Sequence, residues 1–151
     1  MDQNLRELYQ EIILDHSRHP RHFGRLAEAN RTAEGFNPLC GDKVKIDLIV
    51  DEQSRIADVA FDGKGCAISV ASASLMSEIL KGRTIAEAEQ LMGGFLELVK
   101  GGVAEGLRAD DREHLEVMAG VSAFPMRVKC ATLAWHAMKS ALDGGGVAKT
   151  E

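Results

Sequence analysis

The stretch that decides the fold is KVKIDLIVDEQSRIADVAFDG, residues 43–63. Polar and apolar residues alternate through 43–50 and again through 55–63, and the turn sequence DEQS lies between the two runs. Alternation with a period of two is typical of strands that bury one face. Two such runs joined by a short turn predict an antiparallel hairpin, and a further short strand is expected near 32–35.

Helical patterns flank the hairpin. Apolar residues at helical spacing predict a first helix that ends before Pro20, because proline cannot continue it. Capping residues, small apolar runs and helix-starting proline predict further helices over 66–80, 84–100, 112–118 and 125–143. The expected fold class is therefore α+β: a small antiparallel sheet of about three strands packed by helices. We expect one domain over 1–143 and a flexible C-terminal tail over 144–151.

Composition narrows the class of protein. The chain carries 18 basic and 23 acidic residues, a formal net charge of −5, which argues against nucleic acid as a partner. It contains no apolar run near the ~20 residues needed to span a bilayer, so no membrane segment is expected. Three cysteines without a secretion signal favour thiol or metal chemistry in the cytoplasm over a disulfide framework.

The candidate site residues are Cys40, Asp42, Cys66 and Cys130, which lie where loops meet regular elements. Three thiolates and one carboxylate would complete a four-coordinate site suited to zinc or an iron–sulfur unit. Free cysteine is also a common core residue, and a lone aspartate often belongs to a turn. From the pattern alone, both the metal site and the structural interpretation stay open.

Longer motifs around the three thiols resemble a known family. The stretches LYQEIILDHSRHPRHFG, NPLCGDKVKIDLIVD, FDGKGCAISVASASLMSE and GVSAFPMRVKCATLAWHAM are similar to the U-type, IscU/NifU-like, iron–sulfur cluster assembly proteins. The resemblance covers nearly the whole chain. It implies an α+β domain with the cysteine loops clustered at one end and with Cys40, Asp42, Cys66 and Cys130 as metal ligands.

Two features resemble the SufU branch of that family more than the scaffold branch. Lys129 stands where the scaffold branch has a histidine before its third cysteine, and the additional stretch at about 101–121 lengthens the segment between Cys66 and Cys130. The resemblance then implies a zinc-dependent, sulfurtransferase-like protein. Cys40 would accept persulfide sulfur from a SufS-type cysteine desulfurase and deliver it toward the downstream Suf cluster-assembly machinery.

Two alternatives accompany this interpretation. The same ligands could carry iron in a [2Fe-2S] cluster assembled on the protein as a scaffold, or the chain could be a structural zinc adaptor without transfer chemistry. A third motif, HSRHPRH, places His16, His19 and His22 three residues apart. Pro20 and the neighbouring arginines argue against a metal site there, so we interpret this run as a structural loop.

Overall fold

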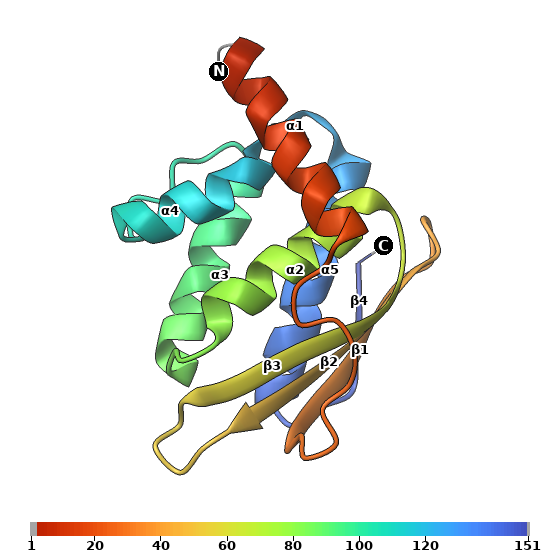
Figure 1. The fold of residues 1–151 in the computed structure, drawn as a ribbon, viewed down its shortest axis with the longest axis vertical. Coiled ribbons are helices and arrows are strands. Elements are labelled where there is room, and N and C mark those ends of the chain that lie inside the picture. The colour runs from red at the N-terminus through yellow and green to blue at the C-terminus, as the bar shows by residue number, and fades with distance from the viewer. Residues whose placement is uncertain (1–2, 151) are drawn as a thin grey trace.

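In the computed structural model, which describes residues 3–150, a four-stranded sheet is packed by helices (Figure 1). The strands are β1 (Arg31–Asn37), β2 (Asp42–Val50), β3 (Ile56–Lys64) and β4 (Val147–Lys149). The helices are α1 (Gln3–Arg18), α2 (Ala67–Leu80), α3 (Ile85–Val99), α4 (Ala109–Leu115), the 3-10 helix η1 (Glu116–Ala123) and α5 (Pro125–Leu142). The predicted α+β class is confirmed.

The predicted hairpin is formed by β2 and β3, which pair antiparallel, and β1 pairs antiparallel with the other side of β2. Alternate residues of β2, Val44, Ile46 and Leu48, are buried against the helices. The intervening Lys43 and Lys45 are exposed on the opposite face. The alternation in the sequence therefore predicts correctly which face of the sheet packs against the core.

The sheet differs from the prediction at its other edge. Residues Val147–Lys149, within the expected flexible tail, form β4 and pair in parallel with Glu34–Phe36 of β1. The sheet is thus mixed and four-stranded, with strand order β3-β2-β1-β4, where about three antiparallel strands were expected. A three-residue strand carries too little alternation to be seen in the sequence. It is specified by the unpaired backbone groups of the β1 edge that it covers.

The helices form a layer on the buried face of the sheet. α5 packs on β1 and β2, and α2 lies between α1 and α5 while also contacting β3. In the core, the ring of Trp135 stacks on that of Phe95 with centroids 4.8 Å apart. Figure 1 shows α3 beside α2 and α4 farther from the sheet. The start of α3 adjoins the β2–β3 turn, where the Ile85 N–H donates to the Ser54 carbonyl at 2.9 Å.

The local signals at the ends of α1, α3 and α5 agree with the structure, whereas the helix expected over 112–118 is instead α4, over Ala109–Leu115, followed by η1. α1 ends at Arg18 before Pro20, and Pro125 occupies the start of α5. Thr84 and Glu87 form the predicted capping box at the start of α3. The additional stretch folds as α4 and η1, and η1 packs against α1, α3 and α5. No described helix is both long and apolar enough to cross a membrane.

Candidate metal centre

Four elements bring the candidate residues to one end of the sheet. Cys40 lies in the loop between β1 and β2, and Asp42 is the first residue of β2. Cys66 is the N-cap residue of α2, directly after β3. Cys130 lies in the second turn of α5. Residues far apart in the sequence therefore meet because three strand ends and two helix starts share this edge.

The sulfur and oxygen atoms of three of these residues are close enough to share one ion. Ligand atoms of Cys40, Asp42 and Cys130 all lie within 4.8 Å of one another, and the sulfurs of Cys40 and Cys130 are 3.4 Å apart. The structure does not include Cys66 in this group, but its Sγ lies 3.9 Å from Asp42 Oδ2, at the edge of the site. Ligands about 2.3 Å from a tetrahedral zinc ion lie about 3.8 Å from each other. The spacing of the Cys40, Asp42 and Cys130 donors is therefore compatible with a bound metal ion of the zinc type.

Asp42 is the most informative residue of the group, because its carboxylate is buried with 0% of the residue exposed. Its Oδ1 accepts the backbone N–H of Cys66 at 2.9 Å. Among the ion pairs of the described residues, none involves Asp42. A buried carboxylate without a cationic partner is strongly disfavoured. The chemistry of this position thus favours a bound cation.

The three thiols have different surroundings. Cys40 and Cys66 are exposed and Cys130 is buried. Burial raises the pKa of the Cys130 thiol far above its ordinary value, and hydrogen bonds with Cys40, Asp42 and Cys66 raise the pKa further. A thiol in such surroundings ionises only when a positive charge is supplied, as a metal ion would do.

Cys66 is held in place by its role in α2. Its Sγ accepts the backbone N–H of Ser69 at 3.4 Å, so the thiol caps the helix. The N-terminal end of a helix attracts negative charge. The expectation that Cys66 begins a helix is confirmed, and the thiol cannot move away without leaving that end uncapped.

Cys40 is held more loosely. Its backbone N–H donates to the Asn37 carbonyl at 3.3 Å, and the next residue, Gly41, has φ +72°. Residues other than glycine rarely adopt that backbone conformation. The glycine beside Cys40 is therefore required by the turn that brings Cys40 and Asp42 toward one point.

One residue of the site, Asn37, was missed in the sequence, whereas a close backbone approach at the glycines before Cys66, Gly63 and Gly65, was expected. Asn37 is fully buried; its Oδ1 accepts the Leu39 N–H at 3.2 Å, and its Nδ2 lies 3.9 Å from Cys130 Sγ. Gly65 passes so close to Asp42 that a Cβ there would be 2.5 Å from Oδ1. The Asn-Pro dipeptide before Cys40 is a known turn signal that could have indicated Asn37, and glycine is the residue type that permits the close approach seen at Gly65.

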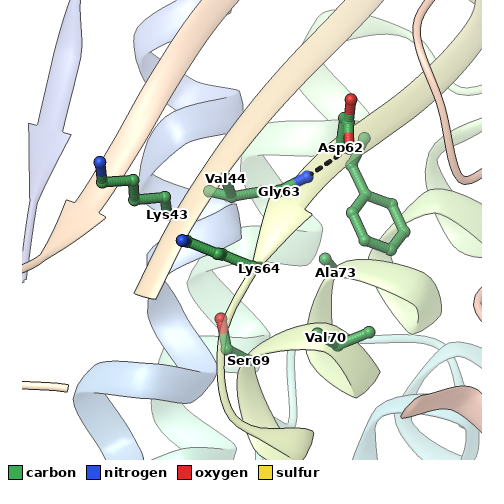
Figure 2. A pocket seen from close by; sticks show the side chains of 9 residues that line it. Lys43, Val44, Asp62, Gly63, Lys64, Ser69, Val70 and Ala73 are labelled. Atoms are coloured by element: carbon green, nitrogen blue, oxygen red, sulfur yellow. Dashed lines mark hydrogen bonds between the residues drawn. The ribbon is translucent and has the colours of Figure 1, made fainter. Parts of the chain in front are cut away.

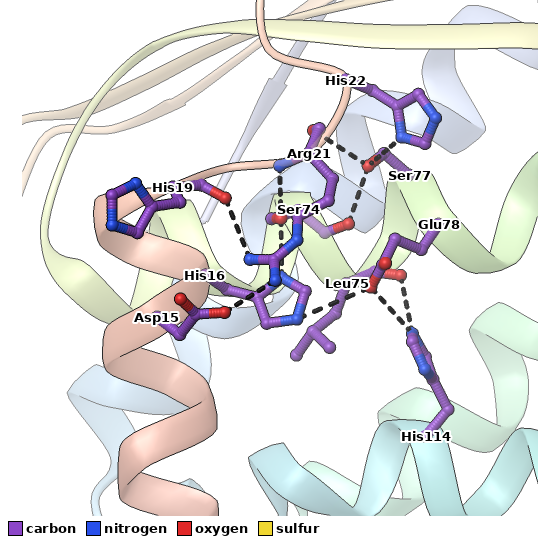
Figure 3. Close-up of polar contacts among 10 residues, drawn as sticks. All are labelled: Asp15, His16, His19, Arg21, His22, Ser74, Leu75, Ser77, Glu78 and His114. Atoms are coloured by element: carbon purple, nitrogen blue, oxygen red, sulfur yellow. Dashed lines mark hydrogen bonds and ion pairs between the residues drawn. The ribbon is translucent and has the colours of Figure 1, made fainter.

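Side chains of the histidine run, residues 16–22, form hydrogen bonds with serines of α2 (Figure 3). His16 Nδ1 lies 2.7 Å from Ser74 Oγ, and His22 Nδ1 lies 3.0 Å from Ser77 Oγ. Within residues 3–150, the group of side chains able to hold a metal includes no histidine. The interpretation of the run as a structural loop therefore holds for residues 19–22 only, because residues 16–18 form the end of α1, where His16 is buried.

Known proteins with similar sequences share the stretches that contain the candidate site residues. The NifU-like N-terminal domain family matches residues 8–144. The chain belongs to this family. It is 40% identical over 138 residues to the iron–sulfur cluster assembly scaffold protein IscU of Streptococcus pyogenes serotype M1, covering 91% of this chain and 84% of the relative. It is 38% identical over 148 residues to the zinc-dependent sulfurtransferase SufU of Bacillus subtilis (strain 168), covering 98% and 95%.

A solved structure agrees with this membership. The chain superposes with a TM-score of 0.81 and 33% identity on a protein from Fervidobacterium islandicum AW-1, described as an iron–sulfur cluster assembly scaffold protein for the SUF system. The match covers 93% of this chain and 99% of the other. The resemblance identified from the cysteine motifs is confirmed, and this NifU-like chain is an iron–sulfur cluster assembly protein. Its relatives bear two different functional names, scaffold and sulfurtransferase.

Proposed function

We propose that this chain is a sulfur carrier that accepts persulfide sulfur on Cys40 from a SufS-type cysteine desulfurase. We further propose that Cys40, Asp42, Cys66 and Cys130 hold a zinc ion. The observation that carries the proposal is the contrast between the thiols: Cys40 is exposed on a loop, while Cys66 caps α2 and Cys130 is buried in α5. The 38% identical relative from Bacillus subtilis, which is named a zinc-dependent sulfurtransferase, supports it.

In the transfer step, one sulfur–sulfur bond forms while another breaks. The Cys40 thiolate attacks the outer sulfur of the partner's persulfide, and a new S–S bond forms on Cys40. The partner's S–S bond breaks, and its electron pair leaves on the partner's cysteine as a thiolate. No net oxidation occurs, so no external oxidant or reductant is needed. When bound, zinc would favour the thiolate form of its ligands and would add no redox chemistry of its own.

The remaining residues prepare Cys40 for this step. Asn37 shapes the turn that presents the Cys40 thiol, and Asp42 anchors the start of α2 through the Cys66 N–H. The sulfur would then pass to the downstream Suf cluster-assembly machinery. We place this activity in the cytoplasm, because free thiols persist in a reducing compartment.

The test is sulfur transfer from free labelled cysteine, catalysed by a SufS-type desulfurase, followed by peptide mapping of this chain. We expect the label on Cys40, with Cys40→Ser folded but unlabelled. Metal content and thermal melts of Cys40→Ser show whether any loss follows from unfolding. Persulfide on Cys66 or Cys130, with Cys40→Ser still labelled, would overturn the proposal.

The scaffold role is the second candidate, because the 40% identical streptococcal relative bears that name. Anaerobic reconstitution of the metal-free protein with iron and sulfide distinguishes the two. A stable [2Fe-2S] absorption spectrum that transfers to an acceptor protein favours the scaffold. Zinc retained at about one ion per chain, with no stable cluster, favours the carrier.

A further inference from the structure

On the solvent-facing side of the sheet, the pairing of charges differs between the row beside the candidate metal centre and the row before it. One cross-strand row on this face contains Glu34, Lys45 and Asp62, which are direct partners in the register. Its charges alternate in sign, and Lys45 Nζ lies 3.5 Å from Glu34 Oε1. This row has the opposite-charge pairing that stabilises a solvent-facing sheet.

The next row toward the site has no such balance. It contains Phe36, Lys43 and Lys64, and the two lysines are direct cross-strand partners. Both lysines are exposed, and none of the ion pairs among the described residues involves either of them. Figure 2 shows their side chains at the ends of β2 and β3. Like charges directly opposite each other destabilise a sheet, so sheet stability does not explain this pair.

The position of the row ties it to the candidate site. Lys43 follows Asp42 directly, and Lys64 is separated from Cys66 by one residue, Gly65. Since the whole chain has a net charge of −5, two adjacent unpaired lysines here run against its overall charge. A positive patch beside a reactive group attracts an acidic partner and raises its rate of association.

A hollow with apolar side chains adjoins Lys43. This cavity of about 310 Å³ is lined by Phe36, Val147 and Lys43, and by Glu34 and Lys45, which pair with each other. Val147, on β4, is 63% exposed, and Lys43 Nζ lies 5.7 Å from the centre of the Phe36 ring. The surface thus offers apolar contact beside positive charge.

We propose that this surface, Phe36, Lys43, Lys64 and Val147, docks an acidic segment of the desulfurase that also carries an apolar side chain. The identity of the partner rests on the proposed function. Docking here would place the partner's persulfide at the end of the sheet where Cys40 lies. The lysines bind the partner and take no part in the exchange of sulfur.

The test measures the association rate constant between the zinc-loaded protein and a SufS-type desulfurase at low and high salt. We expect Lys43→Glu/Lys64→Glu to lower this rate constant on the order of 10-fold at 0.1 M salt. The difference should shrink at 1 M salt, where the screening length falls from about 10 Å to about 3 Å. Zinc content, measured in parallel, confirms an intact site.

A matched control separates docking from net charge. Lys100→Glu makes the same change as Lys64→Glu at an exposed lysine that follows α3 and has no ion pair among the described residues. We expect association of Lys100→Glu at the wild-type rate. An equal slowing by Lys100→Glu and Lys64→Glu, or wild-type association of the double variant, overturns the proposal.

The melting temperature provides a second measurement, which should change in the direction opposite to the association rate constant. Lys64→Glu places a negative charge opposite Lys43, so it should raise the melting temperature of the metal-free protein while slowing association. A structural role for the lysines would make both quantities fall together. Cys40→Ser should associate at the wild-type rate but take up no sulfur. A wild-type protein that docks normally yet takes up no sulfur on Cys40 refutes the proposed function alone. Normal transfer with no effect of the lysines refutes the docking surface alone.

Discussion

Gly65→Ala should weaken zinc binding without replacing any of the proposed ligands, because it displaces the carboxylate of Asp42. A Cβ at this position would lie 2.5 Å from Asp42 Oδ1 and 3.0 Å from its Cγ. Comfortable packing needs about 3.5 Å, so the carboxylate must move by about 1 Å. Asp42 is fully buried and its Oδ1 accepts the Cys66 N–H at 2.9 Å, so this movement also disturbs the start of α2.

The expected size of the effect follows from the tolerance of metal sites. A ligand must stay within about 0.2 Å of its ordinary metal distance, and changes behind the ligands weaken metal binding by about 10–100-fold. We therefore expect the dissociation constant for zinc to rise by that factor, about 1.4–2.7 kcal/mol in binding free energy. Titration against a zinc-binding dye of known affinity measures it directly.

Gly93→Ala is the matched control, because a Cβ there meets nothing within 4 Å. Gly93 lies in α3, away from the candidate ligands, and its substitution should leave the zinc affinity unchanged. Thermal melts of both metal-free variants test whether Gly65→Ala acts only by unfolding the chain. Wild-type zinc affinity in a folded Gly65→Ala protein would refute the assignment of Asp42 as a ligand.

Two further predictions concern stability. Gly93→Ala should raise the free energy of unfolding by about 0.5–1 kcal/mol, or about 2–4 °C at most in melting temperature. Gly94→Ala should lower the free energy of unfolding, because its Cβ would overlap the Leu107 side chain. Equal effects of the two substitutions in thermal melts would contradict this prediction. Burial, and then the charge of Arg21, lowers the pKa of His16, although Glu78 and Asp15 oppose this shift. As the pH drops, the unfolded chain therefore takes up a proton on His16 at a higher pH than the folded chain does. The free energy of unfolding should fall below about pH 6.5. His16→Gln should flatten that part of the profile by at most about 1.4 kcal/mol per pH unit, as denaturant unfolding between pH 7 and 5.5 would show.

The elements that were predicted from the sequence are those with a local cause. Alternation from 43 to 50 reports one buried face, and Thr84 with Glu87 reports a capping box; both arise from residues that touch each other. Gly93 and Gly94 do not interrupt the predicted helix, since α3 runs unbroken from Ile85 to Val99. Burial of the adjoining apolar residues outweighs the low helix propensity of the two glycines.

The features that were not predicted depend on distant partners. β4 pairs with β1 across more than a hundred residues of chain, and nothing near Val147 indicates that pairing. Likewise, the sequence places Asp42 near Cys40 but does not show that its carboxylate accepts the Cys66 N–H. The candidate ligands were singled out from their positions beside loops, and the resemblance then implied a metal role for them, whereas the unpaired lysines beside them follow from the strand register alone.

The three thiols differ in what their movement would disrupt, and this difference favours Cys40 as the mobile one. Moving Cys66 removes the cap of α2, a loss of about 1 kcal/mol for a typical cap, and moving Cys130 displaces a turn of α5 whose neighbours Ala131 and Leu133 are fully buried. Moving Cys40 breaks one backbone hydrogen bond, to the Asn37 carbonyl, in a loop at the surface. A thiol that must meet a partner and return is therefore best placed in this loop. The other ligands can stay fixed while it moves.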